Sequence, residues 1–280
     1  MSSLQNRLQA ALDSRKKRNI LRNLPVPSQQ SESPLIDFYT SDYLSLSSNP
    51  LHRDRFVQRI HERYHTLPTS SLAGSGGSRL LVNSTHHTST EARLTSFFNA
   101  PYSNGGLLFN SGFDANVGVF STLPGPTDFI VFDEYIHASI HDGMRASRVH
   151  PNRKRSFKHN DLADLRLVLE RIAETDKDEA RNVFIAVEGL YSMDGDYAPL
   201  TSIFSLMDSI FPPSSSLQAH LIVDEAHSTC ICGPQGRGLV VHLGLEHRVL
   251  VRLHTFGKAM AASGGTSLQI TNSSFNTKQR

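Results

Sequence analysis

The sequence predicts an α/β fold with a mostly parallel sheet and helices on both faces. From residue 107 onward, short apolar runs alternate with segments in which apolar residues recur at helical spacing. Strands separated by amphipathic helices are typical of a parallel sheet, because each helix carries the chain back across the sheet. At 280 residues the chain is long enough to bury the core of one large domain.

The part of the chain before this alternation is predicted to be mainly helical. Near the N-terminus, leucine recurs at every fourth position, at Leu4, Leu8 and Leu12. In order, we expect a helix that runs into the basic cluster 15–18 and then a Pro-, Ser- and Gln-rich connector over 25–34. A second helix, marked by Phe56, Ile60 and Tyr64, is followed by a glycine-rich loop over 74–79 and by a helix over 85–98. The expected division is a helical arm and linker over 1–45, a large domain over 46–265 and an atypical tail over 266–280.

The alternating part contains five candidate strands. They lie at 107–109, 129–132, 183–187, 220–224 and 249–253. Helices are expected to begin near Phe113 and Ala138, and apolar residues recur at helical spacing over 162–172 and over 200–210.

Polar side chains follow these candidate strands where each strand ends. In open sheets of this kind, ligands bind beyond the carboxyl ends of the strands. By this placement residues 110–113, His137, residues 188–196, Asp224 and Lys258 share one edge of the sheet. Five strand ends that meet at one edge indicate a binding site more strongly than any single motif.

Lys258 and Asp224 indicate the chemistry of this site. Lys258 follows one apolar strand among small and hydroxylated residues, and Asp224 ends another. A pyridoxal phosphate enzyme needs a lysine that holds the cofactor as a Schiff base and a carboxylate that pairs with its pyridinium nitrogen. Burial lowers the pKa of such a lysine toward about 7–8, which an imine-forming amine requires. A lone lysine is usually a surface residue, so the prediction rests on the pair.

Two further features of this edge suit a flat, phosphorylated cofactor. Residues 111–113 open a helix, and the free N–H groups and positive dipole end of a helix suit a phosphate group. His137 follows a strand, where it either caps the next helix or stacks on a cofactor ring. The spacing alone leaves both interpretations of His137 open.

Composition argues against several other classes of protein. A net charge of +2, from 28 basic and 26 acidic residues, indicates no nucleic acid partner. No apolar run approaches the roughly 18 residues of a membrane span, and we expect a cytoplasmic protein, with a peroxisomal or mitochondrial location left open. Cys230 and Cys232 are expected to be reduced thiols, with no disulfide and no metal site.

Residues 224–227, Asp-Glu-Ala-His, have the letters of the DEAH box of RNA helicases. Such a helicase needs an upstream phosphate loop of the form G-x-x-x-x-G-K-[ST]. The Gly257-Lys258 pair lies downstream and is followed by Ala259, and the upstream loop at 74–79 contains no lysine. We therefore reject the helicase interpretation.

Taken together, these segments resemble the α-oxoamine synthases, pyridoxal phosphate enzymes that condense an amino acid with an acyl-CoA. The matching segments run in family order and lie at 41–46, 74–79, 110–116, 137–140, 188–196, 224–227, 236–238 and 255–258. The combination of Ser-Met-Asp-Gly at 192–195 with Thr-Phe-Gly-Lys at 255–258 is highly specific. The resemblance implies the large domain of a fold-type-I pyridoxal phosphate-dependent transferase.

The resemblance also implies the roles of individual residues. The catalytic residues would be Lys258, His137, Asp224 and His227. The cofactor would be held by Lys258 and Asp224, by His227 and Ser192 on its phenolic oxygen side, by His137 on its ring, and by Gly112, Phe113 and Thr255 at its phosphate. The substrates would meet Arg22, Ser75 and His137, with Arg22 at the far carboxylate of the acyl group.

Residues 11–15 followed by Leu21 and Arg22 are most similar to the 8-amino-7-oxononanoate synthases of biotin synthesis. This similarity implies a homodimer that condenses L-alanine with pimeloyl-CoA or a similar acyl-CoA. Other members of the family, such as 2-amino-3-ketobutyrate CoA ligases and polyketide-type oxoamine synthases, share the core motifs and stay as alternatives.

The resemblance implies a chain that is truncated at its C-terminal end. Family members continue past the position of Gly265 into a C-terminal domain, which supplies the arginine that binds the amino acid's carboxylate. Residues 259–261 and Asn83 also depart from the family pattern. An inactive fragment or a non-catalytic dimer partner is therefore the alternative to an active enzyme.

Overall fold

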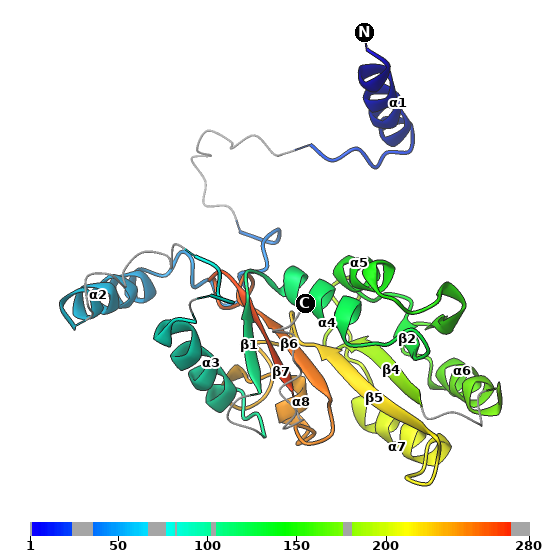
Figure 1. Ribbon diagram of the computed structural model, residues 1–280. Coiled ribbons are helices and arrows are strands. Elements are labelled where there is room, and N and C mark those ends of the chain that lie inside the picture. The colour runs from blue at the N-terminus through cyan, green and yellow to red at the C-terminus, as the bar shows by residue number, and fades with distance from the viewer. Residues whose placement is uncertain are drawn as a thin grey trace. The chain divides into compact units, whose positions relative to one another are not determined.

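The computed structural model describes residues 2–23, 36–66, 77–81, 83–101, 105–175 and 181–269 (Figure 1). The expected connector at 25–34, the first half of the glycine-rich loop (74–76, with Ser75) and residues 270–280 lie outside these ranges. The chain divides into two compact units, Met1–Tyr39 and Thr40–Arg280. The first unit contains α1 (Ser3–Lys17), which begins with a capping box: Ser2 Oγ accepts the Gln5 N–H at 3.3 Å, and Gln5 Oε1 accepts the Ser2 N–H at 2.7 Å.

Within the described residues, the second unit is built on a seven-stranded sheet with the order β1-β7-β6-β5-β4-β2-β3. All the strands are parallel to one another except β7, which runs antiparallel to β1 and β6. The strands are β1 (Gly106–Phe109), β2 (Phe129–Asp133), β3 (Lys154–Phe157), β4 (Arg181–Glu188), β5 (Leu217–Asp224), β6 (Val251–Thr255) and β7 (Gly265–Gln269). The prediction of a mostly parallel sheet is confirmed.

Helices cover both faces of this sheet (Figure 1). On one face, α4 (Gly112–Thr122) and α5 (Ala138–Ala146) pack against the central strands. On the other face, α6 (Leu162–Thr175), α7 (Leu200–Ile210) and the short α8 (Leu239–His242) enclose a second apolar core. On this second face, α3 (Thr85–Phe97) lies against β1 and β7.

The alternation of side chains along β5 assigns residues to these two faces. Leu221 and Val223 belong to the core beneath α7, whereas Ile222 belongs to the core beneath α4 and α5. Because successive side chains of a strand point to opposite faces, Asp224 lies on the α4 and α5 face. The terminal carboxylate of β5 therefore faces the start of α4 and not the apolar core of α7.

Two strands were not predicted from the sequence. β3 has two exposed residues in the middle of its polar Lys-Arg-Ser-Phe sequence, so no apolar run marks it. β7 is small and polar, yet four of its five residues are buried because it lies between β1 and β6. Residues 266–269, which we expected to belong to an atypical tail, are part of this central strand. The strand predicted at 249–253 begins at Val251 and ends at Thr255.

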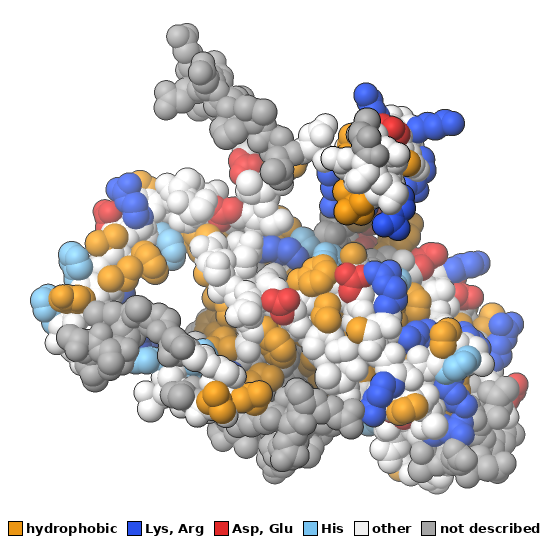
Figure 2. Space-filling view, turned by 45° about the horizontal axis from the view of Figure 1, so that its top comes forward, with side chains coloured by type: hydrophobic (Ala, Val, Ile, Leu, Met, Phe, Trp, Pro, Cys, Tyr) orange, Lys and Arg blue, Asp and Glu red, His pale blue; other side chains and the backbone are white. Residues whose placement is uncertain are grey.

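One helix of the second unit, α2 (Pro50–Thr66), has no buried residue. Its exposed apolar side chains and its histidines are visible in Figure 2, at the end of the molecule where Figure 1 labels α2. Two short 3-10 helices, Pro151–Arg153 and Pro234–Gly236, complete the elements. In the part of the chain that the structure describes, no helix combines the length and the apolar character needed to cross a bilayer.

Candidate functional site

The carboxyl ends of β1, β2, β4, β5 and β6 lie at the same edge of the sheet. They do so because these strands are all parallel, and β7 is the strand that runs the other way. The structure therefore brings together the strand ends that carry Gly112, His137, Glu188, Asp224 and Lys258. This edge is the candidate active site.

Asp224 is the buried carboxylate of the site, with 5% of its surface exposed. Its Oδ2 accepts a hydrogen bond from Asn116 Nδ2 at 2.7 Å, and its Oδ1 accepts one from the Ala226 N–H at 2.9 Å. The same Asn116 amide donates to Ser139 Oγ at 2.9 Å, which joins α4 to α5. Asp224 is thus held in place by neutral donors, and its negative charge is left for a positively charged ligand group.

Lys258 lies in the bend after β6 and is half-buried. Burial lowers the pKa of its amine, while the charges of Asp224 and Glu188 act in the opposite direction. Among the described residues, none makes a hydrogen bond or ion pair with Lys258 Nζ. A half-buried amine with a lowered pKa and no partner is suited to form a covalent bond with a carbonyl group.

His227 lies three residues after Asp224 and is mostly buried. Its Nδ1 lies 2.7 Å from the Oη of Tyr43. Burial, followed by the positive charge of Lys258, lowers the pKa of His227 to about 4. The ring is therefore neutral at physiological pH, and Tyr43 holds its orientation.

The start of α4 lies directly against the end of β6. A Cβ atom on Gly112 would come within 2.8 Å of Thr255 Cβ and 3.0 Å of Thr255 Oγ1, so glycine is required for this approach. Ser111 caps the helix by accepting the Asp114 N–H at 3.0 Å. The first-turn N–H groups of α4 and the Thr255 hydroxyl therefore lie side by side, an arrangement that suits a phosphate group.

His137 and Phe113 expose their rings at this edge. Their centroids are 6.2 Å apart and the rings meet edge to face. His137 also caps α5, because its Nδ1 accepts the Ser139 N–H at 3.2 Å. Both interpretations of His137 from the sequence are thus compatible with its position: it caps a helix, and its ring is still open to a flat ligand.

Glu188 is a second buried carboxylate beside Asp224. The two residues are partners in the register between β4 and β5. Burial first, and then the charge of Asp224, raise the pKa of Glu188 to about 8, although Lys258 and a hydrogen bond from the His137 N–H act against this rise. Glu188 is therefore largely protonated at neutral pH.

Of the expected site residues, Ser192 is not joined to this group by a hydrogen bond, and the structure does not place Arg22 or Ser75 relative to it. Ser192 is exposed on the turn after β4, and no hydrogen bond among the described residues links it to Asp224, His227 or Lys258. Arg22 is exposed in the first unit, whose position relative to the second is not defined. Ser75 lies outside the described residues.

Tyr43, Asn116, Ser139 and Glu188 are site residues to which the sequence analysis gave no role. Asn116 could have been found from its spacing, because it lies four residues after Gly112 and hence on the same side of α4. Glu188 could have been found as the residue that ends its strand, as Asp224 ends the next. Tyr43 carries no local signal of this kind, since its partner His227 lies 184 positions away.

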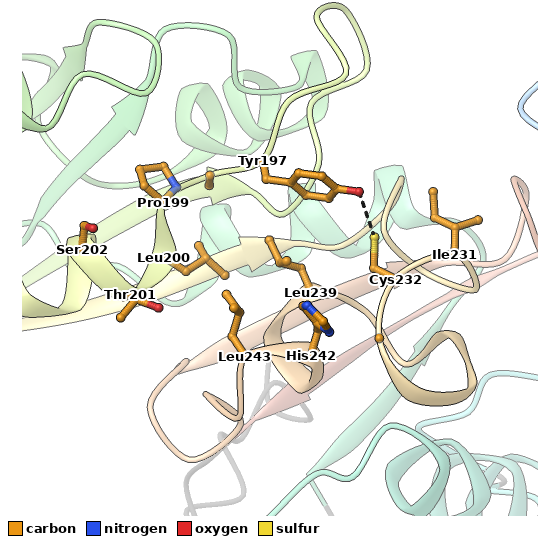
Figure 3. Close-up of a pocket in the computed structure, with 12 residues that line it drawn as sticks. Tyr197, Pro199, Leu200, Thr201, Ser202, Ile231, Cys232, Leu239, His242 and Leu243 are labelled. Carbon is orange, nitrogen blue, oxygen red and sulfur yellow. Dashed lines mark hydrogen bonds between the residues drawn. The ribbon is translucent and has the colours of Figure 1, made fainter.

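A surface hollow of about 550 Å³ lies elsewhere, between the loop before α7, the start of α7 and the short α8 (Figure 3). Tyr197 points across it, and the Cys232 thiol lies 3.7 Å from the Tyr197 Oη. Apolar side chains of Leu200, Leu239 and Leu243 form much of its wall. None of the expected cofactor residues lines this hollow.

The residues at the edge of the sheet fit pyridoxal phosphate. Asp224 offers a buried charge for a protonated ring nitrogen, and Asn116, which positions it, has a buried Oδ1 without a hydrogen-bond partner. Lys258 offers a free amine, and α4 with Thr255 offers a place for a phosphate. Each chemical feature of the cofactor therefore has a matching group at this edge.

Comparison with known proteins agrees with this geometry. Residues 33–269 match the family Aminotransferase class I and II. The 8-amino-7-oxononanoate synthase of Emericella nidulans is 44% identical over 269 residues, which are 95% of this chain and 61% of that protein. The aminoacyl transferase sphA of Byssochlamys spectabilis is 37% identical over 265 residues, which are 93% of this chain and 53% of that protein. The chain thus spans little more than half the length of these relatives.

Solved structures of similar proteins share the fold. One of SPT with PLP, which is pyridoxal phosphate, superposes with a TM-score of 0.70 at 29% identity, over 85% of this chain and 54% of that one. The 8-amino-7-oxononanoate synthase of Francisella tularensis superposes with a TM-score of 0.63 at 30% identity, over 87% of this chain and 60% of that one. The chain therefore belongs to the aminotransferase class I and II family, and within that family it is similar to α-oxoamine synthases, among them a structure that holds pyridoxal phosphate.

Proposed function

We propose that the protein is an acyltransferase that joins an amino acid to the acyl group of an acyl-CoA and releases an α-oxoamine. The observation that carries this proposal is the convergence of Lys258 and Asp224 at one edge of the sheet. Among the described residues, neither the Asp224 carboxylate nor the Lys258 amine has an ion-pair partner. Because both groups are partly desolvated, they contribute little to the stability of the fold. Both groups are suited to bind a cofactor that needs a carboxylate and an amine.

The residues at this edge of the sheet are proposed to bind different parts of the cofactor. Lys258 Nζ would be the point of covalent attachment, and the Asp224 carboxylate would hold a protonated ring nitrogen. The N–H groups of Gly112 and Phe113 and the Thr255 hydroxyl would bind the phosphate, and the His137 ring would cover one face of the cofactor. Pyridoxal phosphate, when bound, supplies an electron sink that makes the Cα–H and Cα–carboxylate bonds of an amino acid easier to break.

Lys258 would have a second task, which is to move a proton at the substrate Cα. Its lowered pKa suits this task, because a lower pKa leaves a larger share of the amine neutral and able to accept a proton. The neutral His227, oriented by Tyr43, is suited to hydrogen-bond the phenolic oxygen of the cofactor. Ser192 is proposed to bind the same oxygen from the turn after β4.

L-Alanine and pimeloyl-CoA are the proposed substrates. The 44% identity to the Emericella nidulans 8-amino-7-oxononanoate synthase supports them, and Arg22 and Ser75 are proposed to meet the acyl group. The aminoacyl transferase relative and the SPT structure support other acyl donors and amino acids as the alternative. As in the family, we propose a homodimer as the working form.

Product analysis tests this proposal. The chain, loaded with pyridoxal phosphate, is incubated with alanine, glycine or serine and with pimeloyl-CoA or palmitoyl-CoA, and the amino-ketone and free CoA are measured by mass spectrometry. Alanine with pimeloyl-CoA is expected to give the most product, with loss of one carboxyl group as CO₂. Lys258→Ala is the matched control. Equal product from Lys258→Ala, or no product from any pair of substrates, would contradict the proposal.

A further inference from the structure

His159 joins the ends of three neighbouring strands, although it is not among the residues assigned to the cofactor above. Its own position is in the turn after β3. Its Nδ1 lies 2.9 Å from Asp133 Oδ1 at the end of β2, and its Nε2 lies 3.0 Å from Asp196 Oδ2 in the turn after β4. Asn160 binds the same two carboxylates, at 2.9 Å through its N–H and at 2.8 Å through its side-chain amide.

The geometry favours a charged His159. Both ring nitrogens face carboxylate oxygens, which only accept hydrogen bonds, so both hydrogen bonds form at once when both nitrogens carry protons. Burial lowers the pKa of His159, but the hydrogen bonds and charges of Asp133 and Asp196 outweigh burial and raise it above 6.5. The titratable groups that face this residue are Asp133, Glu134, Asp196, Tyr135 and Tyr191.

Two aromatic rings extend these contacts to the cofactor edge. Tyr135 stacks on His159 with centroids 4.4 Å apart, and Tyr191 meets it edge to face at 4.5 Å. Tyr135 lies two residues before His137, and Tyr191 lies directly before Ser192. The segments that carry these two expected cofactor residues are therefore both held by His159.

The turn after β4 depends on the same contact. The Tyr191 N–H donates to the Asp196 carbonyl at 2.9 Å, and the Gly195 N–H donates to the Tyr191 carbonyl at 3.0 Å. Asp196 closes this turn, and its carboxylate is 43% exposed. Without His159 and Asn160, solvent would compete for that carboxylate.

We propose that His159 is a positioning residue for the cofactor site, which in its protonated form clamps the His137 and Ser192 segments in one arrangement. The inference rests on the cofactor site proposed above and not on acyl transfer. A chain that binds pyridoxal phosphate but makes no product therefore still tests it.

Two variants separate the positioning role of His159 from its effect on the stability of the fold. His159→Phe keeps a ring for Tyr135 to stack on but removes both hydrogen bonds. Asp196→Asn is the milder change, because it keeps an acceptor for Nε2 and removes only the charge, at a partly exposed position. His247→Asn, which changes an exposed histidine, is the matched control.

Two quantities are measured. The first is the dissociation constant of pyridoxal phosphate, followed by absorbance from about pH 5.5 to about pH 9, a range that spans an ordinary histidine pKa. The second is the amide hydrogen exchange of Gly195 in the cofactor-free protein. For His159→Phe we expect about tenfold weaker binding than the parent at the acidic end, the size of effect that one lost charge-assisted hydrogen bond produces. The dissociation constant of His159→Phe divided by that of the parent should fall toward one as the pH rises through the pKa of His159, because the parent then loses the charge of His159 as well. Exchange of Gly195 should be faster in the variant at the acidic end.

In Asp196→Asn the affinity for pyridoxal phosphate should fall at a lower pH than it does in the parent, because the change removes one of the charges that raise the pKa of His159. His247→Asn should match the parent throughout. A ratio near one at every pH in His159→Phe, or faster Gly195 exchange with unchanged cofactor affinity, would show that His159 is only structural and would overturn the inference.

Discussion

Glu188 and Asp224 end adjacent parallel strands as direct register partners, so two carboxylates lie side by side at the edge of the sheet. Both are buried, at 4% and 5% exposure. Burial first, and then the negative charge of the adjacent Asp224, raise the pKa of Glu188 to about 8. The pair therefore carries close to a single negative charge at neutral pH, which is the charge that a pyridinium needs.

The first prediction concerns the pH dependence of stability. Because the folded-state pKa of Glu188 is raised from 4.5 to about 8, its contribution to the free energy of unfolding is fully present below pH 4.5 and is lost as the pH rises toward 8. Glu188→Gln should remove this loss, which we expect to be on the order of 3–5 kcal/mol between those pH values. Urea denaturation of the cofactor-free protein at both ends of this range measures it. Glu170→Gln, at an exposed position on α6, should leave the slope unchanged, and the same slope in Glu188→Gln would contradict the assignment.

The second prediction concerns the reactivity of Lys258. Burial lowers the pKa of its amine, whereas Asp224 and Glu188 raise it. In the cofactor-free protein, Lys258 should therefore react with an amine reagent at a lower pH than the exposed Lys16, and Asp224→Asn should move the midpoint lower still. Competitive labelling with mass spectrometry measures both midpoints. A midpoint for Lys258 that rises in Asp224→Asn would be inconsistent with this account.

The third prediction concerns Asn116, which positions Asp224. Asn116→Ala removes the 2.7 Å hydrogen bond to Asp224 and the 2.9 Å bond to Ser139 from a side chain that is 3% exposed. We expect a loss of about 1–3 kcal/mol in the free energy of unfolding, because a buried carboxylate loses a donor. Cofactor affinity should fall as well, which titration by absorbance measures. The exposed Asn152→Ala is the control, and parent-like values for Asn116→Ala would show that Asp224 needs no such support.

The fourth prediction concerns the contact between α4 and β6. Gly112→Ala would place a Cβ atom 2.8 Å from Thr255 Cβ, so the start of α4 would have to move away from Thr255. Because both groups are proposed to bind the phosphate, affinity for pyridoxal phosphate should fall by about tenfold or more. Gly77→Ala is the matched control, since a Cβ atom there meets nothing within 4 Å. Unchanged affinity in Gly112→Ala would place the phosphate elsewhere.

Much of the fold was predictable because burial shows directly in the apolar pattern of the sequence. The runs at 129–132, 183–187 and 220–224 are strands, and the helical stripe at 200–210 coincides with α7. Strands without an apolar run could not be predicted in this way. β7 is buried by its neighbours β1 and β6, and no feature of its Gly-Thr-Ser-Leu-Gln sequence reports that.

The site was predictable to the extent that its residues stand at strand ends. Lys258, Asp224 and His137 met this condition, and the parallel strands bring them together. Residues that depend on long-range contacts could not be found in this way, as the 108 positions between Asn116 and Asp224 illustrate. Ser192 follows a strand too, but the length and shape of its turn decide where its side chain lies, and strand order does not determine that.

The covalent attachment of the cofactor to Lys258 tests the central claim most directly. The protein is incubated with pyridoxal phosphate, reduced with borohydride and mapped by peptide mass spectrometry, with Lys258→Ala treated in parallel. The account predicts a single pyridoxyl adduct on Lys258 in the parent and no specific adduct in Lys258→Ala. An absence of adduct, or labelling spread over surface lysines such as Lys16 to the same extent in both proteins, would contradict it.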